Sequence, residues 1–332
     1  MELEASLLQK SLFIKDLKPK ETLRTSFLVK SKNVFYAKNG KPYLAILLSD
    51  STGDLEGRVW ENAEELSTTF SEGDIVAVGG KLHVFQNRNQ LVIDHLISLP
   101  ATETKIEDYL PKSNTDTEVL YQKLIGIFES LDNPWVKELG LKLLYDIEIA
   151  TRYKVCPAAK TIHHAFIGGL LTHSVQLCDL IDAVLPFYAG IDRSLMIFGA
   201  AFHDFGKIFE LSYQGKFGYT DEGRLVGHIA IGVVLIDRKI QEISNFPKEL
   251  ELHLKHLILS HHGKLEHGSP KRPHTLEAEL LHQLDHMDSR INSIQTFMTA
   301  ENNASRWSGY HKTYDQYYFK PIELLKSEIK EN

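Results

Sequence analysis

The chain has 332 residues, of which 43% are hydrophobic and 24% are charged, and its formal net charge is −7 at pH 7. This length allows two domains with buried cores, and the composition is that of a soluble globular protein. The negative net charge argues against a protein coated with basic surface for duplex DNA, but it leaves room for a local basic groove.

The N-terminus and the apolar stretches predict a cytoplasmic protein without a membrane contact. Residues 1–4 are acidic and lack the basic start and apolar core of a secretory signal. Apolar stretches such as residues 229–236 are too short to span a bilayer. The two cysteines, Cys156 and Cys178, form no disulfide framework, and both are expected to be buried thiols.

Residues 11–100 have the pattern of a small β-barrel. Short runs rich in β-branched and aromatic residues, at 25–30, 43–48 and 74–78, are separated by turn signals such as the Asn-Gly at 39–40. A helix is predicted over 61–70, between the third and fourth strands. Five strands with a helix in this place are the layout of an OB fold, although periodicity alone does not separate it from another small barrel.

Cationic and aromatic side chains are interleaved in this region. Eight lysines and arginines lie between residues 15 and 41, against two acidic residues. OB folds hold single strands by stacking bases on aromatic rings and placing cations along the backbone, but a barrel also needs aromatic residues in its core. Phe35 and Tyr36 are adjacent in a strand, so one of them is expected to face outward. The candidates for substrate contact are Phe35, Tyr43, Arg58 and Trp60.

A polar segment over residues 101–117 marks the expected domain boundary. Beyond it, residues 117–131 and 134–145 have apolar positions every three or four residues, which predicts amphipathic helices. The helical pattern continues to the end of the chain. The predicted organisation is an all-β domain over 1–105, a linker over 106–117 and an all-α bundle over 118–332.

Histidines and aspartates recur through the helical part at intervals of about one helix and one loop. His203 and Asp204 close an apolar run, and at a helix end both side chains can turn toward one cation. Imidazole with carboxylate suits zinc, manganese or iron better than calcium. Further candidate ligands are His173, His228, His261 with His262, and Asp285. A bundle can point such ligands inward from several helices, although each histidine taken singly could be a core or surface residue.

This ordered set resembles the HD superfamily of metal-dependent phosphohydrolases. The short sequence motifs around these residues resemble those of the YhaM-type 3'→5' exoribonucleases, which join an N-terminal OB fold to an HD domain. These motifs are His163-His164, Gly168-Gly169-Leu170-Leu171, Gly206-Lys207, Gly227-His228-Ile229, Ser260-His261-His262-Gly263 and Gly268-Ser269-Pro270-Lys271. The resemblance runs over nearly the whole chain. One departure is Leu284, where the family's last motif usually has an alanine.

The resemblance implies a metal-dependent hydrolase that degrades single-stranded RNA from the 3' end, with single-stranded DNA left open as a further substrate. It implies one ion held by His173, His203, Asp204 and Asp285, and a second held by His228, His261 and the shared Asp204. Mn²⁺ is the first choice, ahead of Fe²⁺, Zn²⁺, Ni²⁺ or Mg²⁺. Water between two ions loses its proton near neutral pH and attacks in line. With one ion only, His228 and His261 would instead contact the phosphate.

Other residues near these motifs are candidates for substrate contact. Lys207 lies one helical step after Asp204 and could reach a phosphate oxygen as a point charge, or could be a surface lysine. By resemblance, His164, His262 and Lys271 are candidates for phosphate contact or acid assistance. Asp288, one helical step after Asp285, is the alternative last ligand.

The segment over residues 306–320 is crowded with aromatic residues. It could pack on the bundle, line an RNA path or form a subunit contact, and packing is the favoured interpretation. Together with the resemblance, this segment favours a homo-oligomer. Two other functions are open: an HD phosphohydrolase for free nucleotides with a regulatory OB fold, and a non-catalytic single-strand-binding protein with a structural metal. A complete ligand set argues against the second.

Overall fold

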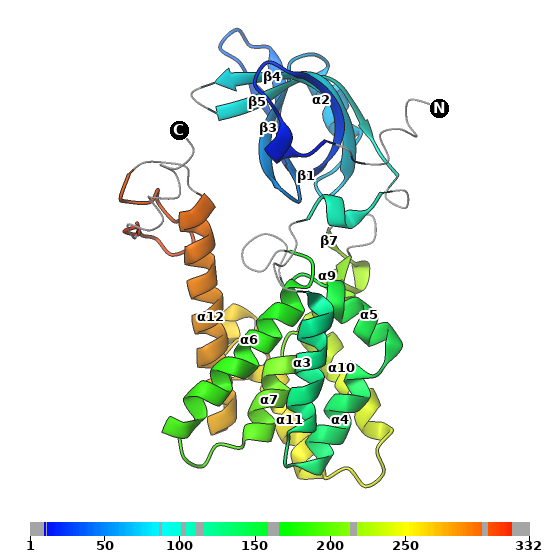
Figure 1. Ribbon diagram of the computed structural model, residues 1–332, viewed down its shortest axis with the longest axis vertical. Helices are drawn as coiled ribbons and strands as arrows, with labels where there is room; N and C mark the ends of the chain where they lie inside the picture. Colours follow the sequence, from blue (N-terminus) through cyan, green and yellow to red (C-terminus); the bar gives the residue numbers. More distant parts are fainter. Residues whose placement is uncertain are drawn as a thin grey trace.

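In the computed structural model, a β-barrel at the N-terminal end is followed by a bundle of helices (Figure 1). The structure describes residues 10, 12–85, 88–100, 104–110, 116–158, 166–212, 218–300 and 305–320. His164 lies outside the described residues, so its role in substrate contact stays a prediction.

The barrel contains five strands and one helix, in the layout that the sequence predicted. Its strands are β1 (Thr22–Tyr36), β2 (Pro42–Asp50), β3 (Gly53–Val59), β4 (Ile75–Phe85) and β5 (Arg88–Ser98), and they close in the order β1-β2-β3-β5-β4. Helix α2 (Ala63–Thr68) lies between β3 and β4. It is shorter than the predicted 61–70, because Asn62 has a left-handed backbone, with φ 52°, that cannot continue the helix toward the N-terminus. The predicted OB fold is confirmed.

Alternation along the strands fills the barrel. Leu44, Ile46 and Leu48 of β2 point inward and are buried, while Tyr43 and Ala45 point to the other face. The segment around the short 3-10 helix η3 (Ile106–Asp108) lies against the barrel, because Ser51 donates its backbone N–H to the Asp108 carbonyl at 3.0 Å. The chain that leaves the barrel is thus held to it before the helices begin.

The helical part runs to residue 300. Its helices are α3 (Thr117–Glu129), α4 (Pro134–Leu144), α5 (Ile147–Val155), α6 (Gly169–Val184), α7 (Arg193–Phe202), α8 (Lys207–Glu210), α9 (Asp221–Val226), α10 (His228–Gln241), α11 (Lys248–Ser260) and α12 (Leu276–Ala300). The two helices predicted over 117–131 and 134–145 are confirmed as α3 and α4, each ending one or two residues earlier. Asp116 and Asn133 begin them, since each side chain accepts backbone N–H groups of the first turn.

Helices α6 and α7 form the centre of the bundle. Aromatic rings interlock there: the Phe128 and Phe202 centroids are 5.4 Å apart, and those of Phe202 and Phe205 are 5.0 Å apart. Cys156 and Cys178 are free and buried in this core, as expected, and burial raises the pKa of both thiols. This core fixes the ends of α6 and α7, from which the ligand residues of the site extend.

One segment corrects an expectation about membranes. Among the described residues, Gly169–Phe187 (α6 with the 3-10 helix η4, Leu185–Phe187) is long and apolar enough to cross a bilayer by length and composition. However, α6 packs against α3, α5, α7 and α12, and Leu170, Leu171 and Leu177 are fully buried. We therefore interpret it as the central helix of the bundle.

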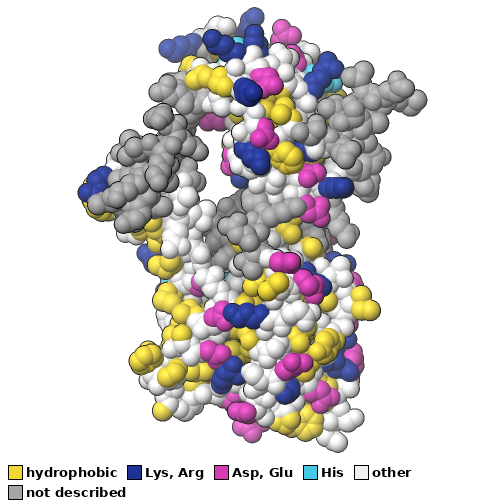
Figure 2. All heavy atoms as spheres, in the orientation of Figure 1, with side chains coloured by type: hydrophobic (Ala, Val, Ile, Leu, Met, Phe, Trp, Pro, Cys, Tyr) yellow, Lys and Arg dark blue, Asp and Glu magenta, His cyan; other side chains and the backbone are white. Residues whose placement is uncertain are grey.

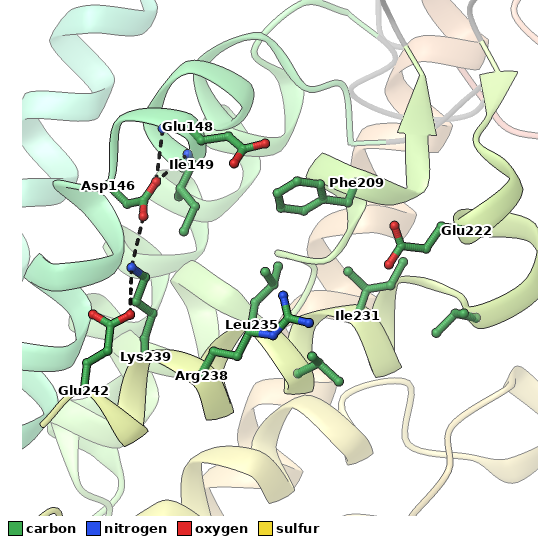
Figure 3. A pocket seen from close by; sticks show the side chains of 12 residues that line it. Asp146, Glu148, Ile149, Phe209, Glu222, Ile231, Leu235, Arg238, Lys239 and Glu242 are labelled. Atoms are coloured by element: carbon green, nitrogen blue, oxygen red, sulfur yellow. Dashed lines mark hydrogen bonds and ion pairs between the residues drawn. The ribbon is translucent and has the colours of Figure 1, made fainter.

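A pocket of about 360 Å³ opens between α5, α8, α9 and α10 (Figure 3). Phe209, Ile231 and Leu235 form its apolar side, and Lys239 lies at its edge in ion pairs with Asp146 and Glu242 at 3.0 and 3.2 Å. None of the candidate metal ligands lines this pocket, so it is separate from the histidine cluster.

Candidate metal centre

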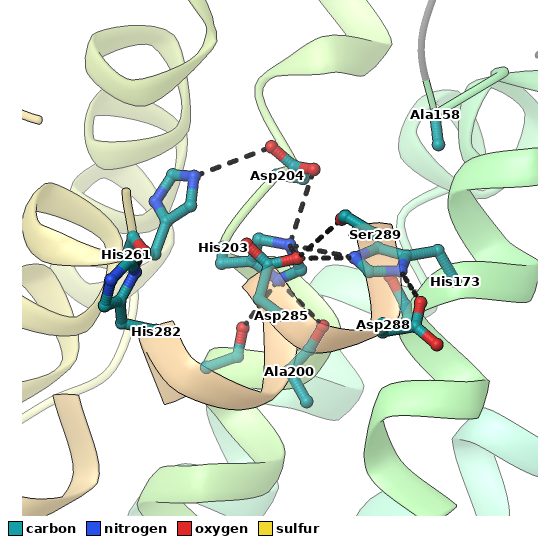
Figure 4. Close-up of polar contacts among 12 residues, drawn as sticks. Ala158, His173, Ala200, His203, Asp204, His261, His282, Asp285, Asp288 and Ser289 are labelled. Atoms are coloured by element: carbon teal, nitrogen blue, oxygen red, sulfur yellow. Dashed lines mark hydrogen bonds and ion pairs between the residues drawn. The ribbon is translucent and has the colours of Figure 1, made fainter. Parts of the chain in front are cut away.

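The predicted ligands come together from five helices. His173 lies in the first turns of α6, His203 and Asp204 follow α7, His228 begins α10, His261 follows α11, and Asp285 lies in the middle of α12. Figure 4 shows Asp204 between His261 on one side and His203, His173 and Asp285 on the other. The ordered set in the sequence therefore becomes one cluster in space.

Four ligand atoms meet on one side of Asp204. The Nε2 atoms of His173 and His203 are 3.3 Å apart. Asp285 Oδ1 lies 3.1 Å from His173 Nε2 and 3.7 Å from His203 Nε2, and Asp204 Oδ2 lies 3.4 Å from His203 Nε2. Ligands bound about 2.1 Å from one ion lie roughly 3–3.5 Å from each other, so the His173, His203 and Asp204 atoms fit a single cation, with Asp285 beside the two imidazoles.

A second group of ligand atoms meets on the other side of Asp204. Asp204 Oδ1 lies 3.3 Å from His228 Nε2 and 3.7 Å from His261 Nε2, and His262 belongs to the same group. Among the described residues, Asp204 Oδ1, His228 Nε2 and His261 Nε2 are buried without a hydrogen-bond partner. Buried polar atoms nearly always have a partner, so three that face one another fit a bound cation.

The other ring nitrogen of each histidine is bonded to an acceptor. These Nδ1 contacts are His173 to Asp288 Oδ2 at 2.9 Å, His203 to the Ala200 carbonyl at 3.1 Å, His228 to Glu210 Oε1 at 3.2 Å, and His261 to the Ile258 carbonyl at 2.7 Å. An acceptor at Nδ1 keeps the hydrogen there and leaves a lone pair on Nε2. With a metal bound, all four rings can therefore present Nε2 to it.

Comparison with known proteins gives the family. Residues 28–99 match the OB-fold nucleic acid binding domain, and residues 169–290 match the HD domain. The chain is 37% identical to the 3'-5' exoribonuclease YhaM of Bacillus velezensis over 80% of this chain and 84% of that protein. It belongs to the YhaM family. The YhaM proteins of Bacillus subtilis and Geobacillus sp. are 35% and 32% identical, over 80% and 91% of this chain and 84% and 93% of those proteins.

In this YhaM-family centre, two carboxylates bind the Nδ1 atoms of histidines whose Nε2 atoms face the metal site. They are Asp288, at His173, and Glu210, at His228. Asp288 Oδ2 contacts His173 Nδ1, and its Oδ1 accepts from Asn292 at 3.0 Å. Asp285 therefore faces the ligand atoms and Asp288 lies behind His173, the order that the sequence favoured. Glu210, which the sequence analysis missed, accepts both the backbone N–H of His228 at 3.0 Å and its ring Nδ1. Nothing in the sequence distinguishes it from a surface glutamate at the end of a short helix.

Gly206 allows α8 to approach the start of α10. A Cβ atom at this position would lie 1.9 Å from the backbone oxygen of His228, closer than any real contact. The glycine of the Gly206-Lys207 motif therefore permits the packing that brings Glu210 to His228. This explains in physical terms why a glycine follows the His-Asp pair so closely.

Lys207 points to Asp204. Its Nζ lies 2.7 Å from Asp204 Oδ2 and 2.8 Å from the Ala158 carbonyl. Burial disfavours both charges, but their attraction outweighs burial: the pKa of Lys207 is raised, and Lys207 with His203 holds the pKa of Asp204 well below its usual range. Lys207 is thus a partly buried partner of the shared carboxylate rather than a free surface lysine.

His262 and Lys271, the other residues near the cluster that were predicted to contact the substrate, differ in burial: His262 is half-buried and Lys271 is exposed. His262 has its ring centroid 4.2 Å from that of His261, and its Nδ1 contacts the His267 carbonyl at 3.0 Å. Burial and the neighbouring His261 lower its pKa to about 4, so a neutral His262 fits a further ligand better than a cationic phosphate contact. Lys271 is exposed, and within the described chain only its backbone is seen in contact, with Leu259 and Ser269.

The aromatic candidates of the barrel form one outer face. The Phe35 and Tyr43 rings stack at 5.8 Å, and Tyr43 lies 4.9 Å from Trp60. Arg58 pairs with Ala45 and shares this face, and its guanidinium is held by Glu56 at 3.1 Å. One of Phe35 and Tyr36 was predicted to face outward, and both are exposed (48% and 66%). They lie on opposite faces, but β1 ends at the barrel rim, where Tyr36 reaches Glu64 of α2 instead of the core.

Proposed function

We propose that this protein is a metal-dependent 3'→5' exonuclease that hydrolyses phosphodiester bonds in single-stranded RNA, and also in single-stranded DNA. The observation that carries the proposal is the position of Asp204, which gives one carboxylate oxygen to each of two ligand groups. The HD match and the exoribonuclease name of the relatives support this reading. A cluster of this kind exceeds what a structural metal needs, which argues against a purely binding protein.

We propose two divalent ions, with Mn²⁺ preferred over Fe²⁺, Zn²⁺, Ni²⁺ or Mg²⁺. His173, His203, Asp204 and Asp285 would hold one ion, and Asp204, His228, His261 and His262 the other. When bound, two such ions supply an activated water and a clamp for the phosphate oxygens. The chain's own part is to fix the rings: Asp288 and Glu210 hold His173 and His228 in orientation, and Lys207 holds Asp204 Oδ2.

The barrel would hold the strand upstream of the cleavage point. Phe35, Tyr43 and Trp60 offer adjacent rings on which unpaired bases can stack, and a pocket of about 390 Å³ lies beside Trp60 between β3, β5 and α2. Figure 2 shows lysine and arginine side chains at the barrel end of the molecule, with acidic side chains among them. Such cationic side chains suit a single strand despite the net charge of −7. By family resemblance we also infer a cytoplasmic homo-oligomer, divided into residues 1–105, 106–117 and 118–332.

The test is a time course with single-stranded RNA labelled at the 5' end in one reaction and at the 3' end in the other, with and without Mn²⁺. A 3'→5' exonuclease gives a descending ladder from the first substrate and an immediate labelled mononucleotide from the second. Asp204→Asn is the control and should give neither product. Phosphate release from free nucleotides without shortening of RNA would instead support a nucleotide phosphohydrolase with a regulatory OB fold. No reaction with any substrate would support a binding protein.

A further inference from the structure

Helix α12 carries a row of nitrogen-bearing side chains that leads away from the metal centre. His282, His286 and Arg290 are four residues apart, so they lie one turn after another on one face of the helix. His286 and Arg290 are exposed. We propose that this row, together with the aromatic hairpin that it reaches, is a second track for single-stranded nucleic acid, distinct from the barrel face. The proposal rests on the exonuclease function proposed above.

The row begins at the metal centre. His282 Nδ1 donates to the backbone carbonyl of the ligand His261 at 2.8 Å, and the His282 and His286 ring centroids are 6.1 Å apart. A strand whose terminal phosphate sits at the ligand cluster therefore meets these two imidazoles as it leaves along α12. Neither ring belongs to the two ligand groups; the His286 ring is exposed, whereas the His282 ring is half-buried and lies against Gly263.

The row ends at a hairpin formed by residues 305–320, which is closed by bridges between Trp307 and Phe319 and between His311 and Gln316. The hairpin packs on the same face of α12: the Arg290 guanidinium lies 4.9 Å from the Tyr314 ring, and Phe297 lies 4.5 Å from His311. This confirms the favoured expectation that the segment packs back. His282 and Phe297 are 15 residues apart, which is about 22 Å along a helix.

Packing on α12 leaves several aromatic rings of the hairpin accessible. Trp307, Tyr310, Tyr317 and Phe319 remain 54%, 47%, 58% and 51% exposed. They form two pairs, with the Trp307 and Phe319 centroids 5.1 Å apart and those of Tyr310 and Tyr317 5.3 Å apart. Arg306 lies 4.3 Å above the Phe319 ring. Half-exposed rings flanked by cations are the surface on which unpaired bases stack.

Charge favours nucleic acid over a second copy of this chain as the occupant. The exposed charges of residues 305–320 are Arg306 and Lys312 against Asp315, since Lys320 is buried, and the Asp315 carboxylate is engaged by the Tyr310 hydroxyl. A polyanion complements this surface. The hairpin stands at the end of α12 beyond the bundle, on the side where the barrel lies (Figure 1). A strand that runs from the metal centre toward the barrel can therefore follow α12 on the way.

The experiment measures binding of a fluorescent single-stranded RNA by anisotropy, in the inactive Asp204→Asn background and without hydrolysis as a readout. Trp307→Ala and Tyr317→Ala should each weaken binding of a long strand by about 5- to 150-fold, the range for one lost stacked base. Arg290→Ala should lower the slope of log K against log salt by about 0.7, and Arg290→Lys, which keeps the charge, should not. The matched controls are Phe187→Ala and Tyr188→Ala, which remove exposed rings (82% and 53%). These rings follow the C-terminal end of α6, whereas the ligand His173 lies near its N-terminal end. Both controls should bind RNA as the Asp204→Asn protein does.

Two results would overturn the proposal. One is unchanged long-strand binding in both hairpin variants. The other is a shift of the oligomeric state in light scattering with strand binding intact, which would assign the hairpin to a second copy of the chain. Failure of the exonuclease function is seen separately, as absence of Mn²⁺-dependent cleavage of RNA by the unmodified protein. The binding comparison does not depend on that outcome.

Discussion

Replacing Glu210 by glutamine should weaken one metal equivalent and leave the other unchanged. Glu210 Oε1 accepts two N–H groups of His228, from the backbone at 3.0 Å and from the ring at 3.2 Å, and its side chain is only 11% exposed. Glutamine keeps the shape and one carbonyl acceptor but removes the charge. The orientation of the ring is then held less firmly, and His228 Nε2 becomes a weaker donor to the metal.

The magnitude follows from the type of hydrogen bond that is lost. A bond to a charged group contributes about 1.5–3 kcal/mol and a neutral one about 0.5–1.5 kcal/mol, so the charge is worth roughly 1–1.5 kcal/mol here. This corresponds to a loss of about tenfold in affinity at one site for Glu210→Gln. Glu210→Ala removes the support entirely, and its loss should approach the hundredfold end of the usual range for such partners. Calorimetric titration of the metal-free protein with Mn²⁺ measures both values.

Asp288→Asn is the matched change at the other site, because Asp288 supports His173 as Glu210 supports His228. In a His228→Ala background, Glu210→Gln should have no further effect on the remaining equivalent, whereas Asp288→Asn should still weaken it. The reasoning is refuted if Glu210→Gln binds two equivalents with unchanged affinity. It is also refuted if both variants weaken the same equivalent in that background.

Four further outcomes are expected. Asp204→Asn should abolish RNA hydrolysis and reduce bound Mn²⁺ in elemental analysis with an unchanged circular dichroism spectrum, since Lys207 keeps a neutral acceptor; full activity would refute the shared-carboxylate centre. Lys207→Ala should lower kcat but retain metal, and loss of metal would contradict this. Gly206→Ala should lower the midpoint of thermal unfolding and weaken one Mn²⁺ equivalent, because its Cβ would meet the His228 oxygen, at a typical overpacking cost of about 1–3 kcal/mol; wild-type values would show that the close approach is not needed. Tyr43→Ala and Trp60→Ala should each weaken single-strand binding by about 1–3 kcal/mol, whereas Tyr36→Ala, on the opposite face, should not; equal effects of all three would misplace the strand.

Much of the local structure was readable from the sequence. Strand alternation and turn residues predicted the barrel, and spacings of three and four residues predicted α3 and α4, because these patterns depend on neighbours within one element. The order of the histidine and aspartate motifs identified the ligand candidates, and the resemblance to the family's last motif gave the preference for Asp285 over Asp288. By length and composition α6 could also span a membrane, and only its packing identifies it as the central helix of the bundle.

The sequence by itself determined the candidate ligands, and the tertiary structure decided how they are arranged. His173 and Asp288 are separated by 115 residues, and no local pattern gives the distance between helices. Only the packed bundle shows that Asp204 offers one oxygen to each ligand group, that Lys207 turns to this carboxylate, and that Glu210 stands behind His228. The physical reason is that helix propensity and amphipathicity act over a few residues, whereas the ligand geometry is set by how large buried side chains such as Phe202 and Phe205 fit together across helices.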